Sequence, residues 1–257
     1  MLMNQNTNTN IFSGYIEGYY GKLLSWKSRK KIISKLSCSK MNTYFYAPKE
    51  DLYHRYKWRE TYPISWQKKF KDFCHFAKSH NIRIIVGISP GLDFNFNSIS
   101  DRLERTENDL SLLISKIDFF YSNGIENIVL MLDDIPNNFK KKFPDLNEGN
   151  IHANILNILT KHFGKEMSFV PRIYSDELLN ECPSYFYNFF KTVKVNFNLF
   201  YCGKYIVSSE FSSKIKQIKN HKKITIWNNY YANDYCPNKL ILGCWNFNYK
   251  NIMYNLT

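Results

Sequence analysis

Short apolar runs alternate with longer amphipathic segments along the whole chain, and this pattern predicts eight strands separated by helices. The strands are expected at 12–17, 43–46, 82–88, 127–132, 167–170, 195–201, 224–227 and 240–242. The helices are expected near 25–37, 65–80, 101–122, 149–163, 182–193 and 209–220. In 65–80, for example, Trp66, Phe70 and Phe73 recur at the spacing that places them on one helical face.

Regular alternation of strands and helices implies parallel strand pairing, because each helix carries the chain back to the start of the sheet. With eight strands, a closed (β/α)8 TIM barrel is the simplest way to pair every strand edge. The length of 257 residues suits one such barrel. No shift in composition marks a second domain, so the sequence predicts a polar extension over 1–11 and one barrel domain over 12–257.

Composition indicates a globular protein with a large core, since 44% of the residues are hydrophobic and 17% are aromatic. The opening MLMNQNTNTN lacks the basic-then-apolar layout of a secretory signal. The longest apolar runs, such as IRIIVGI, are too short to span a bilayer. These features predict a soluble, cytoplasmic protein with no membrane partner.

Two further features exclude other classes of site. The formal charge of +13 comes largely from lysines in predicted helices such as SRKKIISK, where solvated helix faces explain them better than specific nucleic-acid binding. The six cysteines form no C-x-x-C pair and no zinc-type spacing with histidine, so they are expected to be reduced. The sequence suggests no metal site and no organic cofactor.

The unusual residues of the chain cluster directly after the predicted strands. EGYYG follows the first strand, APKED the second, SPGLD the third, DDIP the fourth, PRIYSDE the fifth, CGK the sixth and NNYYANDY the seventh. Barrel enzymes assemble their active sites from these loops, at the carboxyl ends of the strands. The clustering therefore favours an enzyme with its site at this face.

Asp133 and Asp134 end the most hydrophobic strand, IVLML, and two interpretations of them compete. Aspartate is common at turns and helix N-caps, which is the structural interpretation. The functional interpretation is an active-site pair, since paired carboxylates with divergent pKa values are usual in glycoside cleavage. Adjacent residues are poorly placed to attack one bond from opposite sides. This favours substrate-assisted cleavage, in which a 2-acetamido group supplies the nucleophile.

The runs SGYIEGYYGKLLSW, MNTYFYAPKEDLYHRYKWRETYP, ISPGLDFNF, LMLDDIP and IWNNYYANDY follow one another in this order. Together they closely resemble the catalytic domain of glycoside hydrolase family 84, the family of the protein O-GlcNAcases and related bacterial β-N-acetylglucosaminidases. The resemblance runs from about residue 12 to the end of the sequence. It implies a retaining exo-β-N-acetylglucosaminidase without a cofactor, acting through an oxazoline intermediate on a GlcNAc-bearing glycoprotein or glycan.

The resemblance also implies roles on the acetamide side of the sugar. Asp133 corresponds to the carboxylate that polarises the acetamide N–H, and Asp134 to the general acid and base. Tyr174 corresponds to a tyrosine that holds the acetamide or oxazoline oxygen. Asn229 matches an acetamide-binding asparagine, and Trp227 matches a wall of the acetamide pocket, although a tryptophan there would equally suit the core.

On the hydroxyl side, Gly18 matches a glycine whose backbone carbonyl meets a sugar hydroxyl, and an obligatory turn glycine is its structural interpretation. Lys49 corresponds to a hydroxyl-binding lysine, although most lysines are merely solvated. Asp234 corresponds to the acceptor for the distal hydroxyls, and Asn255 to a sugar-binding asparagine.

Several departures from the family pattern bear on the expected activity. PRIYSDE stands where many members have Thr-Glu-Tyr-Cys, Asn228 stands where an aspartate is usual, and CWNFN replaces a Pro-aromatic-x-Gly-Arg stretch. The helix covering the eighth strand is expected to be missing, which would leave an apolar barrel edge available for oligomerisation. The alternative function is a truncated GlcNAc-binding protein with little or no turnover.

Overall fold

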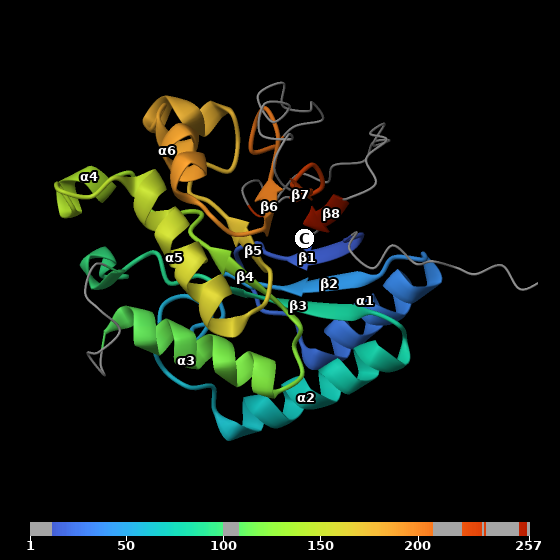
Figure 1. Ribbon diagram of the computed structural model, residues 1–257. Coiled ribbons are helices and arrows are strands. Elements are labelled where there is room, and N and C mark those ends of the chain that lie inside the picture. The colour runs from blue at the N-terminus through green and yellow to red at the C-terminus, as the bar shows by residue number, and fades with distance from the viewer. Residues whose placement is uncertain (1–11, 100–107, 208–222, 233, 235–251, 256–257) are drawn as a thin grey trace, which may run out of the picture.

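The computed structural model describes residues 12–99, 108–207, 223–232, 234 and 252–255, and its centre is a closed barrel of eight parallel strands (Figure 1). Each strand pairs with its neighbours in chain order, and β8 closes the barrel against β1. The strands are β1 Gly14–Glu17, β2 Thr43–Tyr46, β3 Arg83–Ile88, β4 Asn127–Met131, β5 Met167–Val170, β6 Phe197–Tyr201, β7 Lys223–Asn228 and β8 Ile252–Asn255. The predicted (β/α)8 fold is therefore confirmed.

Among the described residues, helices lie outside the barrel between successive strands from β1 to β6 (Figure 1). They are α1 Trp26–Cys38, α2 Ile64–Ser79, α3 Asp109–Ser122, α4 Phe139–Lys142, α5 Glu148–Phe163 and α6 Tyr185–Thr192, with 3₁₀ turns η1 Phe96–Ile99 and η2 Glu177–Glu181. Side-chain caps set three of the starts, because Ser25, Asn108 and Asn147 each accept a backbone N–H of the first turn. None of the described helices is long and apolar enough to cross a membrane.

One predicted boundary is wrong, and two predicted elements lie outside the described residues. The eighth barrel strand is Ile252–Asn255, so the closing YNLT begins inside a strand; the predicted strand 240–242 lies outside the described residues. The helix expected at 182–193 starts only at Tyr185, after the 3₁₀ turn. The helix expected at 209–220 is outside the description, and the missing cover on β8 stays a prediction.

The barrel interior is filled mainly by apolar side chains, which form the floor beneath the carboxyl ends of the strands. Phe45 lies within 5.5 Å of both the Phe200 and the Trp227 ring centroids. Met131 fills the space beside Gly87, where an added Cβ would come within 2.4 Å of its sulfur. A packed interior of this kind leaves substrate access only from the ends of the barrel.

A second, larger core joins the helices to the outside of the barrel, and one buried ion pair crosses it. The Glu17 carboxylate, at the end of β1, accepts two hydrogen bonds from Arg29 Nε and one from Arg29 Nη2 of α1, and a fourth from the Tyr44 hydroxyl at 2.6 Å. Both charged side chains are buried. This cluster fixes α1 against the end of β1, directly before Gly18.

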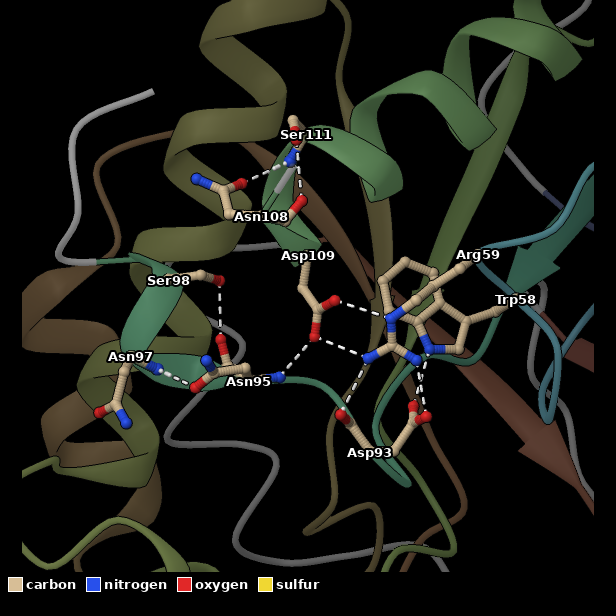
Figure 2. A network of polar contacts seen from close by, with 9 residues as sticks. All are labelled: Trp58, Arg59, Asp93, Asn95, Asn97, Ser98, Asn108, Asp109 and Ser111. Carbon is tan, nitrogen blue, oxygen red and sulfur yellow. Dashed lines mark hydrogen bonds and ion pairs between the residues drawn. The ribbon is translucent and has the colours of Figure 1, made fainter. Parts of the chain in front are cut away.

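A polar network ties the loop after β2 to the loop after β3 (Figure 2). Arg59 forms ion pairs with Asp93 at 2.6 Å and Asp109 at 2.7 Å, and Trp58 Nε1 donates to Asp93 at 2.9 Å. Asp109, the first residue of α3, also accepts a hydrogen bond from the backbone N–H of Asn95. The network holds the β2–α2 loop, which carries Lys49, at the carboxyl end of the barrel.

Replacing Arg29 with methionine should destabilise the protein by about 3–5 kcal/mol, because the Glu17 carboxylate would be left buried without its cation. Urea denaturation measures the change in the free energy of unfolding. The matched control is Glu60→Gln, which breaks the exposed Lys57–Glu60 pair and should change stability by less than about 1 kcal/mol. Equal losses in the two variants would contradict the structural role given to the buried pair.

Candidate active site

A cavity of about 320 Å³ opens at the carboxyl ends of the strands. Its lining comes from the ends of β1, β2, β4, β5, β6 and β7 and the loops that follow them. Eight of the predicted site residues line it: Gly18, Lys49, Asp133, Asp134, Tyr174, Trp227, Asn229 and Asp234. The structure thus brings together residues that are far apart in the sequence.

The Asp133–Asp134 pair lies just past the end of β4, where the chain leaves the sheet. Strand geometry would point neighbouring side chains to opposite faces. Here Asp134 has φ +52°, in the left-handed region that aspartate tolerates better than most residues. This turn of the backbone lets both carboxylates reach the same cation.

That cation is Lys49, in the motif APKED that follows β2. Its Nζ lies 2.5 Å from Asp133 Oδ2 and 3.0 Å from Asp134 Oδ2, and the side chain is only 1% exposed. Burial alone would lower the pKa of Lys49, but the two carboxylates outweigh burial and raise it. The lysine is therefore a fixed positive charge between two like charges.

Asp134 is held by further hydrogen bonds. Tyr174 OH donates to its Oδ1 at 2.7 Å, and Tyr20 OH donates to its Oδ2 at 3.1 Å. Arg55 donates from Nη2 to the Asp134 carbonyl at 2.7 Å. Both the carboxylate and the backbone of this residue are thus fixed by side chains from other strand ends.

The two carboxyl groups have opposite pKa shifts in the unliganded protein. Burial raises the pKa of Asp133, and the opposing attraction of Lys49 does not fully offset it. Burial also acts on Asp134, but Lys49 and the hydrogen bond from Tyr174 outweigh it and lower the pKa to about 2. Asp134 is thus the more acidic member of the pair before any ligand binds.

Asp133 has one oxygen that is poorly satisfied. Its Oδ2 bonds Lys49, whereas its Oδ1 is buried and accepts no hydrogen bond within the described structure. Buried carboxylate oxygens almost always have a donor, so an unsatisfied one calls for an explanation. A ligand N–H entering the cavity would supply the donor.

The opposite wall is built by β7 and the loop after it. Trp227 Nε1 donates to Asn229 Oδ1 at 2.8 Å, which orients the asparagine, and Asp234 Oδ2 accepts the backbone N–H of Tyr20 at 2.9 Å. Gly18 is required where it stands, because a Cβ there would come within 2.5 Å of the Trp227 ring. The backbone of Asn255 pairs with Ile16 in the barrel, and its side chain is outside the description.

Three lining or supporting residues escaped the sequence analysis: Tyr20, Arg55 and Cys202. Tyr20 and Arg55 lie inside motifs that the analysis quoted, EGYYG and YHRYKWRE, and their position beside assigned residues was the available signal. Cys202 lies in the quoted run CGK, but no assigned residue stands beside it. Among the described residues, no group of three histidine, cysteine, aspartate or glutamate side chains could hold a metal ion.

A parallel barrel that presents a carboxylate pair at the carboxyl ends of its strands has the kind of site that glycoside hydrolases use. A sequence model described as beta-N-acetylglucosaminidase matches residues 13–257. The chain therefore belongs to the β-N-acetylglucosaminidase family, glycoside hydrolases, as the resemblance implied.

Relatives and solved structures agree with this family. The chain is 28% identical over 243 residues to the protein O-GlcNAcases of Rattus norvegicus and Mus musculus, covering 90% of this chain and 25% of theirs. It is similar to the structure of CpGH84B, with TM-score 0.81 and 29% identity over 95% of this chain and 44% of that one. A variant of the Thermobaculum terrenum O-GlcNAc hydrolase gives TM-score 0.73 and 26% identity over 87% and 48%. The chain thus spans about a quarter of the length of these curated relatives.

Replacing Lys49 with methionine should raise the pKa of Asp134 from about 2, because burial would then act without the opposing cation. Carboxyl ¹³C NMR titration of the folded variant measures the shift. Lys57→Met, which removes an exposed lysine of the same loop, is the control and should leave the Asp134 titration unchanged. An unaltered Asp134 pKa in Lys49→Met would show that the lysine does not set the charge of the pair.

Proposed function

We propose that residues 12–257 form the catalytic domain of a retaining exo-β-N-acetylglucosaminidase that removes terminal β-linked GlcNAc by substrate-assisted catalysis. The observation that carries this proposal is Asp133 Oδ1, a buried carboxylate oxygen without a donor in a cavity otherwise rich in paired groups. The N–H of a 2-acetamido group is a donor of the right kind. A sugar lacking that amide would leave the oxygen unsatisfied.

In the first step the acetamide carbonyl oxygen attacks the anomeric carbon. The bond from that carbon to the leaving oxygen breaks, and Asp134 transfers its proton to the leaving oxygen. Asp133 accepts the acetamide N–H and stabilises the positive charge that develops on the oxazoline ring. In the second step Asp134 removes a proton from water, and the water oxygen opens the ring at the anomeric carbon with net retention.

The charge state of the pair has to change when the sugar binds. In the unliganded protein Asp134 is the stronger acid, whereas the reaction needs Asp134 protonated and Asp133 ionised. An N–H donated to Asp133 favours its ionised form and lowers its pKa. Sugar hydroxyls that draw Lys49 away, together with loss of water around Asp134, raise the Asp134 pKa. Substrate binding therefore prepares the acid.

The remaining cavity residues divide between the two sides of the sugar. On the acetamide side, Tyr174 and Asn229 bond the amide and the Trp227 ring packs against the methyl group. On the other side, the Gly18 carbonyl, Lys49, Asp234 and Asn255 bind hydroxyls. The substrate class is a GlcNAc-bearing glycoprotein or glycan, and the relatives named protein O-GlcNAcases favour GlcNAc linked to serine or threonine.

The protein should hydrolyse a chromogenic β-GlcNAc glycoside but not the corresponding β-glucoside, because only the first carries the amide nucleophile. A thiazoline mimic of the oxazoline should inhibit this turnover. Release of the chromophore, followed over time with both glycosides, measures the difference. Tight GlcNAc binding without turnover would instead support the binding-protein alternative, and equal turnover of the glucoside would overturn the mechanism.

The Asp133→Asn and Asp134→Asn variants should respond differently to the leaving group. Asp134→Asn removes the proton donor, so kcat/KM should fall by about 10²–10⁴-fold with a poor leaving group and far less with a good one. Asp133→Asn should lower the rate by a similar factor for both, because the amide attacks whatever group leaves. A series of aryl β-GlcNAc glycosides measures this, and equal losses across the series in Asp134→Asn would refute its role as acid.

A further inference from the structure

Arg55 is a buried arginine that bonds to the backbone of Asp134 and to Tyr20, but to neither carboxylate of the pair. It lies in the β2–α2 loop and is 4% exposed. Its two terminal nitrogens make different bonds: Nη2 donates to the Asp134 carbonyl at 2.7 Å, and Nη1 donates to Tyr20 OH at 3.0 Å. The first bond reaches Asp134 directly, and the second reaches it through Tyr20, whose hydroxyl donates to the Asp134 carboxylate.

The first bond acts on the backbone. Asp134 is one of three non-glycine residues with positive φ in the described structure, and the other two, Lys40 and Asn81, directly follow the C-caps of α1 and α2, where left-handed residues are common. Asp134 follows a strand instead, so helix capping does not explain its conformation. The Arg55 bond to its carbonyl fixes the peptide that this conformation turns.

The second bond acts on the carboxylate. Tyr20 OH accepts from Arg55 and has its own proton free to donate, and it donates that proton to Asp134 Oδ2 at 3.1 Å. Because the arginine occupies the acceptor side of the hydroxyl, the tyrosine proton is directed at the carboxylate. Tyr20 is 41% exposed, so without Arg55 the ring would be free to turn toward solvent.

We propose that Arg55 is a positioning residue that holds both the backbone and the carboxylate of Asp134 in the orientation required of the acid and base. Arg55 itself touches neither Asp133 nor the carboxylate of Asp134. The inference rests on the proposed function for the role of Asp134, and it assigns to the YHRYKWRE motif a part in the reaction. Lysine cannot replace arginine here, because one ammonium cannot span the Asp134 carbonyl and the Tyr20 hydroxyl as the planar guanidinium does.

The first test compares Arg55→Met, Arg55→Lys and the parent on the series of aryl β-GlcNAc glycosides. Both variants should lose about 10–100-fold in kcat/KM with a poor leaving group and less with a good one, because a misplaced acid matters most where the proton is needed. In an Asp134→Asn background, Arg55→Met should cause no further loss. A loss that is uniform across the series, that persists in that background, or that Arg55→Lys fully restores would overturn the proposal.

The second test does not depend on turnover. Carboxyl ¹³C NMR titration of Asp134 should give a higher pKa in Arg55→Met, and also in Arg55→Lys, which keeps the charge but loses the geometry. A crystal structure of Arg55→Lys should show the Asp134 backbone outside the left-handed region or the Tyr20 hydroxyl turned away. If Asp134 keeps its conformation and its titration in both variants, the positioning role is wrong even if the parent is an active enzyme. If the parent fails to hydrolyse β-GlcNAc, the proposed function fails and this second test still decides the role of Arg55.

Arg59 offers a matched control in the same loop (Figure 2). It also joins two elements by ion pairs, with Asp93 and Asp109, and among the described residues no hydrogen bond or ion pair joins it to the carboxylate pair. Arg59→Met should lower thermal stability without altering the leaving-group dependence or the Asp134 titration. The comparison separates a general weakening of the loop from a specific loss at Asp134.

Discussion

The site depends on one interaction, the buried Lys49 ammonium held between the Asp133 and Asp134 carboxylates. Two adjacent carboxylates in one cavity repel, and removing either from water is unfavourable. Burial disfavours the charged lysine in turn, and the two carboxylates outweigh that effect and raise its pKa. The lysine therefore offsets the repulsion within the pair, and the fold has to bring the end of β2 against the end of β4.

The barrel meets that requirement in two ways. Parallel pairing places every strand end at the same face, so a lysine after β2 and aspartates after β4 come within reach across β3. The loop that carries Lys49 is then tied down at its far end by the Arg59 network (Figure 2) and, near the site, by Arg55. On the other side of the cavity the buried Glu17–Arg29 pair holds the start of the β1 loop. These fixed elements surround the site.

Hydrophobic periodicity was enough to predict seven strands, because each is a short apolar run followed by turn residues. It did not identify the eighth, Ile252–Asn255, because two of its four residues, Tyr254 and Asn255, carry polar groups. It favoured instead the fully apolar stretch LIL at 240–242, which lies outside the described residues. The placement of the site was predictable from the same pattern, because unusual residues follow each strand. What could not be read from the sequence is the left-handed Asp134 and the bonds from Tyr20 and Arg55. Tyr20 is 114 positions from Asp134 in the chain and Arg55 is 79 positions from it, and no local sequence pattern indicates either bond.

The electrostatics of the unliganded pair also bear on selectivity. With its pKa lowered to about 2, Asp134 is ionised at neutral pH in the unliganded protein. Under the proposed function, the ligand that changes this gives an N–H to Asp133 and draws the Lys49 ammonium away from Asp134, as a sugar with both an amide and neighbouring hydroxyls would. A sugar with hydroxyls alone would leave Asp133 unsatisfied and its pKa raised. In that proposed mechanism, substrate recognition and the preparation of the acid are the same event, because one set of hydrogen bonds produces both.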